Sequence, residues 1–411
     1  MNVSPFKRRI FKGLAALAML GVLGVAAALG SLWVEHGTGI ALPTPTGPFA
    51  VGRCLYDWVD DTTLDALAPA PGTKRELLVW IWYPAAAGQS SAVVDDYVPA
   101  SVRAPAGRVG GSPFFRLLTR DLSKVHGHSL RDAGVSPQQR SYPVVIMRAG
   151  GSLEVANYST LAEDLASHGY VVVGLDAPYR TFDVVFPDGR VIARTPENNM
   201  ELVSGEEFTR RGKKLLAAWT SDIWFVLDRL ERLNASDPSG RFTGRLDMIR
   251  VGVFGHSFGG AQAAQFCQED SRCKAGIDID GALFGSVIQA GIHKPFLFLL
   301  SGNGDFSSAA EIRQYQADIQ SVYDRLPADG RLRVSIRGAS HFTFSDDGAL
   351  LKSHLVMGLF RVFGMLGIDG RRQLAVTAYC VHSFFDAYLK GAGVSRLEIT
   401  SPSYPEIQVI E

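Results

Sequence analysis

The stretch Arg250-Val-Gly-Val-Phe-Gly-His-Ser-Phe-Gly-Gly260 decides the fold of this chain. Its first half is an apolar run typical of a buried strand, and a helical pattern follows after Gly255-His256-Ser257-Phe258-Gly259. A serine on such a turn is held in a strained conformation with its hydroxyl above the sheet, and the glycines are needed because larger side chains would collide. The stretch therefore predicts a nucleophile at Ser257, beside which the helix-terminal N–H groups face developing negative charge.

Short apolar runs alternate with helical periodicity along the rest of the chain. Residues 206–233, for example, place apolar side chains at helical spacing. Apolar strands joined by helical crossovers predict an α/β fold, with a mostly parallel sheet and helices on both faces. The expected strands are residues 77–83, 143–147, 170–175, 250–254, 275–279, 295–300 and 332–336.

One catalytic domain is expected over residues 50–411, with two inserts. Residues 85–139 are rich in Gly, Pro, Ser and Ala, and residues 181–205 are polar. Inserts of this length in a compact fold are usually lids or binding loops. The apolar cluster at residues 113–118 fits a lid helix packed on the domain, or a segment that dips into a lipid interface.

The N-terminal sequence predicts that the chain is exported from the cytoplasm. A basic segment, residues 1–12, precedes an uncharged apolar run, residues 13–34, which as a helix reaches about 33 Å and can cross a bilayer. The basic cluster keeps the N-terminus in the cytoplasm and places the rest of the chain outside, in the periplasm or the extracellular space. A cleaved signal peptide is the alternative, which would make the protein secreted. Residues 35–49 are expected to form a Pro-rich linker.

Composition excludes some classes of partner. The chain has 41 Lys and Arg against 41 Asp and Glu, and this zero net charge argues against nucleic acid. The four cysteines match no zinc motif. Cys267 and Cys273 are the nearest pair that could form a disulfide outside the cytoplasm, Cys54 with Cys380 is a further pair, and buried free thiols are the alternative.

A serine nucleophile needs a histidine to take its proton and a carboxylate to orient that histidine. His341 fits best, because it follows the expected strand at 332–336 in a short turn; His293, His354 and His382 are alternatives, and His256 points elsewhere as the elbow neighbour. For the acid, Asp280 and Asp305 each follow a strand, and topology alone does not choose between them. Asp278 lies within a strand and is expected to have a structural partner.

Several motifs resemble the platelet-activating factor acetylhydrolase family, of the secreted and lipoprotein-associated type, within the α/β-hydrolase superfamily. The resemblance covers most of residues 42–390, and it is carried by the elbow region at 246–261, GIDIDG at 276–281, and segments 42–52, 82–84, 165–170 and 338–341. It implies an α/β-hydrolase fold and favours Asp280 as the acid. It also implies a calcium-independent esterase or phospholipase A2 for short or oxidised sn-2 acyl groups, with no cofactor and no metal.

The chain departs from the usual pattern at the oxyanion loop, where Arg148-Ala-Gly-Gly151 replaces the His-Gly that such hydrolases often carry. Backbone N–H groups form this hole, so Gly151 and Phe258 remain the expected donors. The expected substrate is a small-molecule or lipid ester, and the membrane is contacted through the N-terminal helix. A general carboxylesterase or a polyester or cutinase-like hydrolase is the rival interpretation. A membrane-tethered binding protein that has lost catalysis is the alternative of another class.

Overall fold

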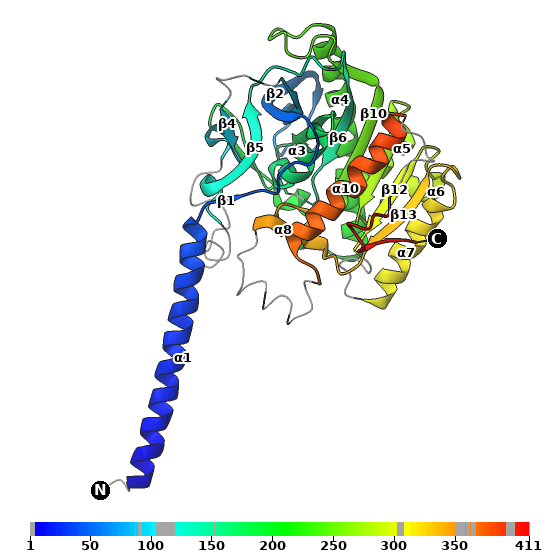
Figure 1. Ribbon diagram of the computed structural model, residues 1–411. Coiled ribbons are helices and arrows are strands. Elements are labelled where there is room, and N and C mark those ends of the chain that lie inside the picture. Colours follow the sequence, from blue (N-terminus) through cyan, green and yellow to red (C-terminus); the bar gives the residue numbers. More distant parts are fainter. Residues whose placement is uncertain are drawn as a thin grey trace.

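In the part of the chain that the structure describes, a mixed sheet of 12 strands forms the body of the molecule. A long N-terminal helix extends away from it (Figure 1). The computed structural model describes residues 5–86, 88, 93–103, 120–151, 153–301, 308–350, 358, 362, 367–391 and 399–410. The apolar cluster expected at 113–118 lies outside these residues.

Parallel strands form the centre of the sheet. β6, β7 and β12 are buried along their whole length, which explains why their sequences are apolar throughout rather than alternating. The predicted α/β fold with a mostly parallel sheet is confirmed. In spatial order the parallel strands are β7 (Val171–Asp176), β6 (Tyr142–Arg148), β10 (Leu246–His256), β11 (Cys273–Ile279), β12 (Phe296–Leu300) and β13 (Arg331–Ile336).

Further strands extend both edges of this centre. β2 (Ala50–Leu64) and β3 (Lys74–Ala85) form an antiparallel hairpin, and β3 also pairs antiparallel with β7. β5 (Val125–Arg131) joins β2, β1 (Ile40–Ala41) and β4 (Val94–Asp96), and β14 (Ile407–Val409) pairs with β13. The insert expected at 85–139 thus supplies β4 and β5 to the sheet. The insert expected at 181–205 contains the small hairpin of β8 (Asp183–Val185) and β9 (Val191–Ala193).

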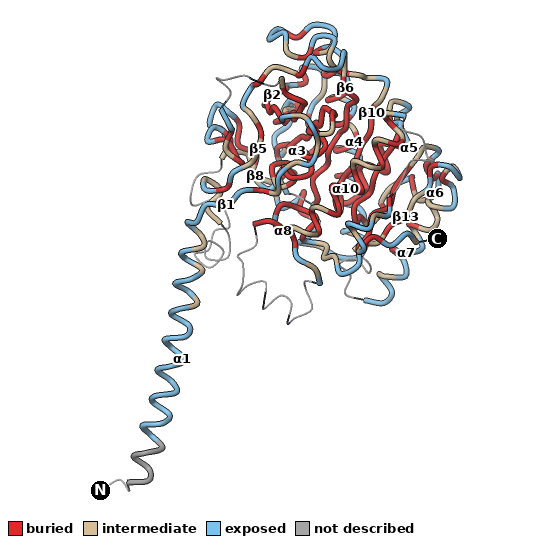
Figure 2. Tube along the Cα trace, viewed as in Figure 1, coloured by how far each residue is buried: buried red, intermediate tan, exposed pale blue. Residues whose placement is uncertain are grey.

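Helices cover both faces of the sheet, and each face has its own apolar core (Figures 1 and 2). The strands separate the cores by alternation: Phe254 of β10 belongs to the first core, and its neighbour Val253 to the second. The helices of the first core are α3 (Ser159–Ser167) and α10 (Gly370–Leu389). Those of the second core are α4 (Gly205–Ala235), α5 (Phe258–Glu269), α6 (Val287–Ala290) and α7 (Ala309–Tyr323).

α1 (Pro5–Gly37) stands apart from the domain, and its stretch Phe11–Gly37 is long and apolar enough to cross a membrane. A signal sequence would satisfy the same criteria. The chain then enters the domain at β1. Leu42 is buried, and the backbone N–H groups of Thr46 and Gly47 donate to side chains of α3 at 2.9 Å. The structure therefore extends the packed domain to Ile40, into the segment expected to be a linker.

Cys267 and Cys273 form a disulfide that joins the end of α5 to the start of β11. Cys54 and Cys380 are buried thiols and are not paired with each other.

Candidate active site

Ser257 lies on a sharp turn between β10 and α5, with φ of 55° and ψ of −124°. Residues other than glycine rarely adopt positive φ, so the turn holds its serine in a strained conformation. Neighbouring glycines make the turn possible. A Cβ on Gly255 would overlap the carbonyl oxygen of Gly259, and a Cβ on Gly259 would lie 2.5 Å from the carbonyl oxygen of Arg148. The GxSxG spacing is therefore required by backbone packing at this point.

Three side chains that the sequence singles out are hydrogen-bonded in series. His341 Nε2 lies 3.1 Å from Ser257 Oγ, and His341 Nδ1 lies 2.8 Å from Asp280 Oδ2. His341 begins a short 3₁₀ turn, η6 (His341–Phe344), after β13, and Asp280 directly follows β11 with φ of 55°. Because the carboxyl ends of parallel strands meet at one edge, strands far apart in the sequence bring these groups together.

The Asp280 side chain is fully buried and is held by the next strand end as well. Ser301 donates its backbone N–H to Oδ1 at 2.8 Å and its hydroxyl to Oδ2 at 2.7 Å. Burial by itself raises the pKa of Asp280, but the hydrogen bond and charge of His341 and the bonds from Ser301 outweigh it, so the pKa is held below its ordinary value. An ionised carboxylate only accepts hydrogen bonds, so the proton of a neutral His341 lies on Nδ1 and Nε2 is left to face Ser257.

The other acids and histidines that the sequence offered lie elsewhere. Asp278 is buried, and burial raises its pKa well above the ordinary range; it accepts the N–H of Gly281 at 2.9 Å. His293 is exposed, and His382 pairs with Asp164 on α3 at 3.1 Å. Asp305 and His354 lie outside the described residues.

His256, the residue before Ser257, contacts His341 and Tyr158. Its Nδ1 lies 2.7 Å from the hydroxyl of Tyr158, which accepts the N–H of Gly150 at 3.0 Å. Its ring packs against His341 with 4.6 Å between ring centroids. Burial first, and the proximity of His341 second, lower the pKa of His256 to about 3, so this imidazole is neutral at physiological pH.

A cavity of about 330 Å³ opens beside Ser257. Gly151, which has φ of 51°, and Phe258, the first residue of α5, line it together with Ser257 and His341. These are the two positions at which the sequence predicted backbone donors. The opposite wall comes from α4 and from the segment that follows β9, with Trp219, Leu215, Asn198, Met200 and Arg194 among its residues. A larger groove of about 1370 Å³ along α4 and α7 shares Phe208 and Ala282 with this cavity.

Two buried guanidinium groups lie against the cavity residue Trp219, and the sequence reasoning gave neither of them a role in the site. Arg148 and Arg180 lie 4.0 and 5.1 Å from the ring centroid of Trp219. Arg148 ends β6, donates to Gln262 Oε1 at 2.8 Å and to the carbonyl oxygen of Leu175 at 2.6 Å, and so fixes the strand end from which the Gly150-Gly151 loop leaves. Burial lowers the pKa of Arg148 to about 10, which leaves it charged at neutral pH. A single charged residue at the end of an apolar strand is the only sequence signal for it.

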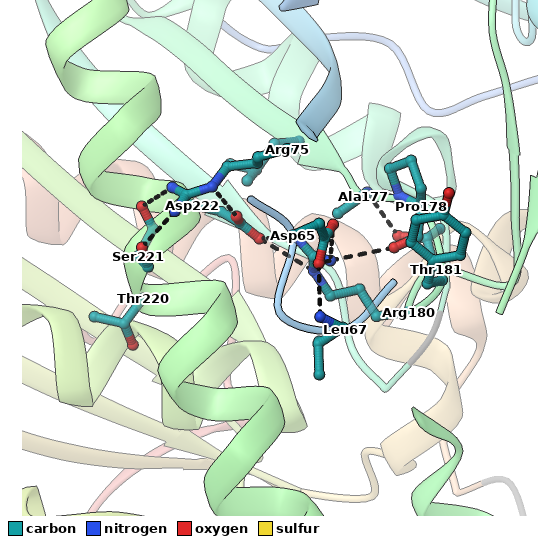
Figure 3. Close-up of polar contacts among 12 residues, drawn as sticks. Asp65, Leu67, Arg75, Ala177, Pro178, Arg180, Thr181, Thr220, Ser221 and Asp222 are labelled. Atoms are coloured by element: carbon teal, nitrogen blue, oxygen red, sulfur yellow. Dashed lines mark hydrogen bonds and ion pairs between the residues drawn. The ribbon is translucent and has the colours of Figure 1, made fainter. Parts of the chain in front are cut away.

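Arg180 is compensated by two buried carboxylates (Figure 3). It contacts Asp65 at 2.8 Å and Asp222 at 2.7 Å, and Arg75 nearby donates to Ser221 at 3.0 Å. Buried charges must be paired in this way to be tolerated. The network ties the β2–β3 turn, the loop after β7 and α4 into one rigid wall of the cavity.

Known proteins resemble this chain over most of its length. A family described as platelet-activating factor acetylhydrolase, isoform II, matches residues 231–390, which include Ser257, Asp280 and His341. A probable 1-alkyl-2-acetylglycerophosphocholine esterase of Arthroderma benhamiae is 26% identical over 399 residues, covering 90% of this chain and 94% of the relative. The platelet-activating factor acetylhydrolase of Cavia porcellus is 26% identical over 219 residues, covering 50% of this chain and 48% of the relative.

Among solved structures, a ferulic acid esterase from Streptomyces cinnamoneus superimposes with a TM-score of 0.72 and 27% identity, covering 91% of this chain and all of that one. Fold and relatives together define the chain as a carboxylic ester hydrolase of the α/β-hydrolase superfamily. Within that superfamily its sequence is similar to those of the platelet-activating factor acetylhydrolases.

Proposed function

We propose that the chain is a serine esterase in which Ser257 is the nucleophile, His341 the general base and Asp280 the orienting acid. The observation that carries this proposal is the continuous hydrogen-bond series, 3.1 Å from Ser257 Oγ to Nε2 of His341 and 2.8 Å from Nδ1 to Asp280. Nucleophile, base and orienting group within hydrogen-bond reach are the geometric requirement for covalent acyl transfer.

In the first half-reaction Nε2 of His341 takes the hydroxyl proton as Ser257 Oγ attacks the ester carbonyl. The N–H groups of Gly151 and Phe258 stabilise the tetrahedral oxyanion, and each such donor contributes about 3 kcal/mol to lowering the barrier. The imidazolium, stabilised by Asp280, then protonates the alcohol oxygen, and the acyl-enzyme forms as the alcohol leaves. Water repeats the sequence on the acyl-enzyme and releases the acid. This chemistry requires no metal and no cofactor.

The proposed substrate is a phospholipid with a short or oxidised sn-2 acyl group. The activities for which the relatives are named support it, and so does the cavity of about 330 Å³, which is near the lower limit for small-molecule pockets and suits a small acyl group. The adjoining groove has room for the remainder of a large ester. We further propose that α1 anchors the chain in a membrane with the domain outside the cytoplasm, unless it is cleaved as a signal peptide.

The test is hydrolysis of p-nitrophenyl acetate by the detergent-solubilised full chain, compared with Ser257→Ala. We expect the variant to lose more than about a thousandfold in kcat. Equal rates above the uncatalysed background would refute Ser257 as the nucleophile. Equal rates at the background level would favour a ligand-binding protein.

A broader carboxylesterase is the second candidate, favoured by the full-length similarity to a ferulic acid esterase. Phosphatidylcholines with short and long sn-2 chains, a soluble triglyceride, a feruloyl ester and a polyester film separate the two. Preference for the short-chain phospholipid supports the first candidate. Indifference to the phospholipid headgroup supports the second.

A further inference from the structure

One arginine connects the end of α1 to the catalytic side of the domain. Arg120 Nη1 donates to the carbonyl oxygen of Glu35, in the last turn of α1, at 3.1 Å. Its Nε donates to the carbonyl oxygen of Leu350 at 2.9 Å. Leu350 ends α8 (Asp347–Leu350), which closely follows the turn that carries His341. A planar guanidinium suits this role because it satisfies carbonyl groups that helix ends leave unpaired.

The connection between α1 and the sheet leaves little slack. Thr38 donates its hydroxyl to the carbonyl oxygen of Val34 at 2.7 Å, and the backbone N–H of Asp121 donates to the carbonyl oxygen of His36 at 2.9 Å. β1 begins at Ile40 and pairs at once with β5. Only Thr38 and Gly39 separate helix and strand, so the direction of α1 is fixed relative to the domain. Figure 1 shows α1 projecting from the end of the domain at which α8 lies.

Four exposed apolar residues each lie within two positions in the sequence of a residue that lines the catalytic cavity. Leu153, Phe182 and Phe342 follow the carboxyl ends of β6, β7 and β13, the edge of the sheet that also carries Ser257, and Leu202 adjoins the cavity residues Met200 and Glu201. Their exposed fractions are 38%, 45%, 55% and 63% in the order Leu153, Phe182, Phe342, Leu202. We call these four residues the apolar rim. Exposed apolar residues gathered near a cavity favour contact with an apolar surface rather than with water.

From these observations we propose that the apolar rim docks on the non-cytoplasmic leaflet of the membrane that α1 crosses, and that the enzyme takes ester lipids from its own membrane. We identify the surface that the rim contacts as lipid because α1, which leaves the domain on the same side, is apolar enough to enter a membrane. Trp33 lies four residues before Gly37, the end of α1, and tryptophan is a residue found at the membrane interface. This inference rests on the proposed function and on α1 remaining attached.

The experiment uses the uncleaved full chain, its mass verified, reconstituted in phosphatidylcholine vesicles. The substrate is a fluorogenic acetyl ester carried on a two-chain lipid that does not exchange between vesicles during the assay. It is placed either in the vesicles that hold the protein or in separate vesicles. We expect the initial rate to be at least about tenfold higher when enzyme and lipid share a vesicle, because attachment to one surface raises their effective concentration. Equal rates in the two arrangements would refute the inference.

Two variants test the geometry. Phe182→Ser/Leu202→Ser removes half of the rim, and Arg120→Ala releases α1 from α8. Each should lower the shared-vesicle rate severalfold while leaving hydrolysis of the free soluble ester unchanged. Ile249→Ser is the matched control, because Ile249 is 79% exposed near the start of β10, at the opposite edge of the sheet. If the rim variant and this control behave alike, the rim has no role.

The soluble ester separates this inference from the proposed function. If its hydrolysis survives Ser257→Ala, the proposed function fails and the inference fails with it. If its hydrolysis depends on Ser257 but the two vesicle arrangements give equal rates, only the docking surface is refuted.

Discussion

Replacing Asp280 with Asn should nearly abolish activity without changing the shape of the site. Oδ1 of Asp280 accepts a backbone N–H from Ser301, and that donor can be satisfied only by an oxygen. The amide oxygen of Asn must therefore occupy the Oδ1 position, and its NH₂ group then faces Nδ1 of His341, where Oδ2 now accepts at 2.8 Å. Nδ1 becomes an acceptor, the ring proton moves to Nε2, and Nε2 can no longer take the proton of Ser257.

The size of the loss follows from this change of tautomer. The same substitution in a serine protease triad lowers kcat by about 10⁴-fold, and a tenfold change corresponds to about 1.4 kcal/mol of barrier. We expect a loss of similar size for Asp280→Asn, about 5 kcal/mol. Stability should change less, because the two side chains have the same shape and the bond from the Ser301 backbone is kept.

The assay is release of p-nitrophenol from the acetyl ester by wild type, Asp280→Asn and two controls. Asp278→Asn is the matched control: Asp278 is buried two residues before Asp280 and accepts the N–H of Gly281 through Oδ1, which an amide oxygen can also do, so the variant should stay within about tenfold of wild type. Asp305→Asn tests the other acid that topology allows. The reasoning is wrong if Asp280→Asn retains a tenth of wild-type activity, or if only Asp305→Asn is crippled.

Three further predictions concern stability, measured by urea unfolding. Arg180→Gln leaves Asp65 and Asp222 buried without their cation and should cost about 3 to 5 kcal/mol. Arg190, whose side chain is 45% exposed beside Glu76, is the comparison, and Arg190→Gln should cost less than about 1 kcal/mol. Similar costs for the two variants would contradict the assigned burial. Gly255→Ala should lower the free energy of unfolding by several kcal/mol, because its Cβ would overlap the backbone of Gly259. Gly39→Ala, whose Cβ would lie 3.6 Å from the nearest atom, should have a small effect. A small effect of Gly255→Ala would contradict the packing described for the turn. The pKa of His256 is lowered to about 3 in the folded state against about 6.5 when unfolded, so its neutral form contributes stability above pH 6.5 that is lost as the pH falls toward 3. His256→Gln should therefore reduce the stability lost between pH 7 and pH 5 by about 2 kcal/mol, and an unchanged loss would show that His256 does not contribute it.

Local pattern was enough to predict the central sheet and the position of Ser257. Buried parallel strands are apolar throughout, so each expected central strand overlaps an observed one, from β3 to β13. The strands beside this centre were missed for the opposite reason: β2 is buried over residues 51–54 but mostly exposed towards its end, and β5 has only two buried residues among its seven. The structure brings Ser257, His341 and Asp280 into contact, and their catalytic roles stay a proposal for the Asp280→Asn and Ser257→Ala tests.

The acid and the cavity wall required long-range geometry. Asp280 and Asp305 both follow strands, and nothing in the spacing of either residue identifies the one that faces His341. Arg180 gives no local signal, because its partners Asp65 and Asp222 come from segments 115 and 42 residues away. Pairings between distant segments leave no periodicity in the sequence, so a buried charge and its counter-ions are found only when the chain is folded.

The Cys267–Cys273 disulfide has a consequence for the strained serine. Lys294 Nζ donates to the carbonyl oxygens of Cys267 and Asp270 at 2.6 and 2.5 Å, so the far end of α5 is held by a covalent link and an ammonium group together. A helix free at that end could rotate and let Ser257 relax to negative φ. Because α5 is held at both ends, the backbone of Ser257 is kept in its strained conformation, and the disulfide is part of that constraint.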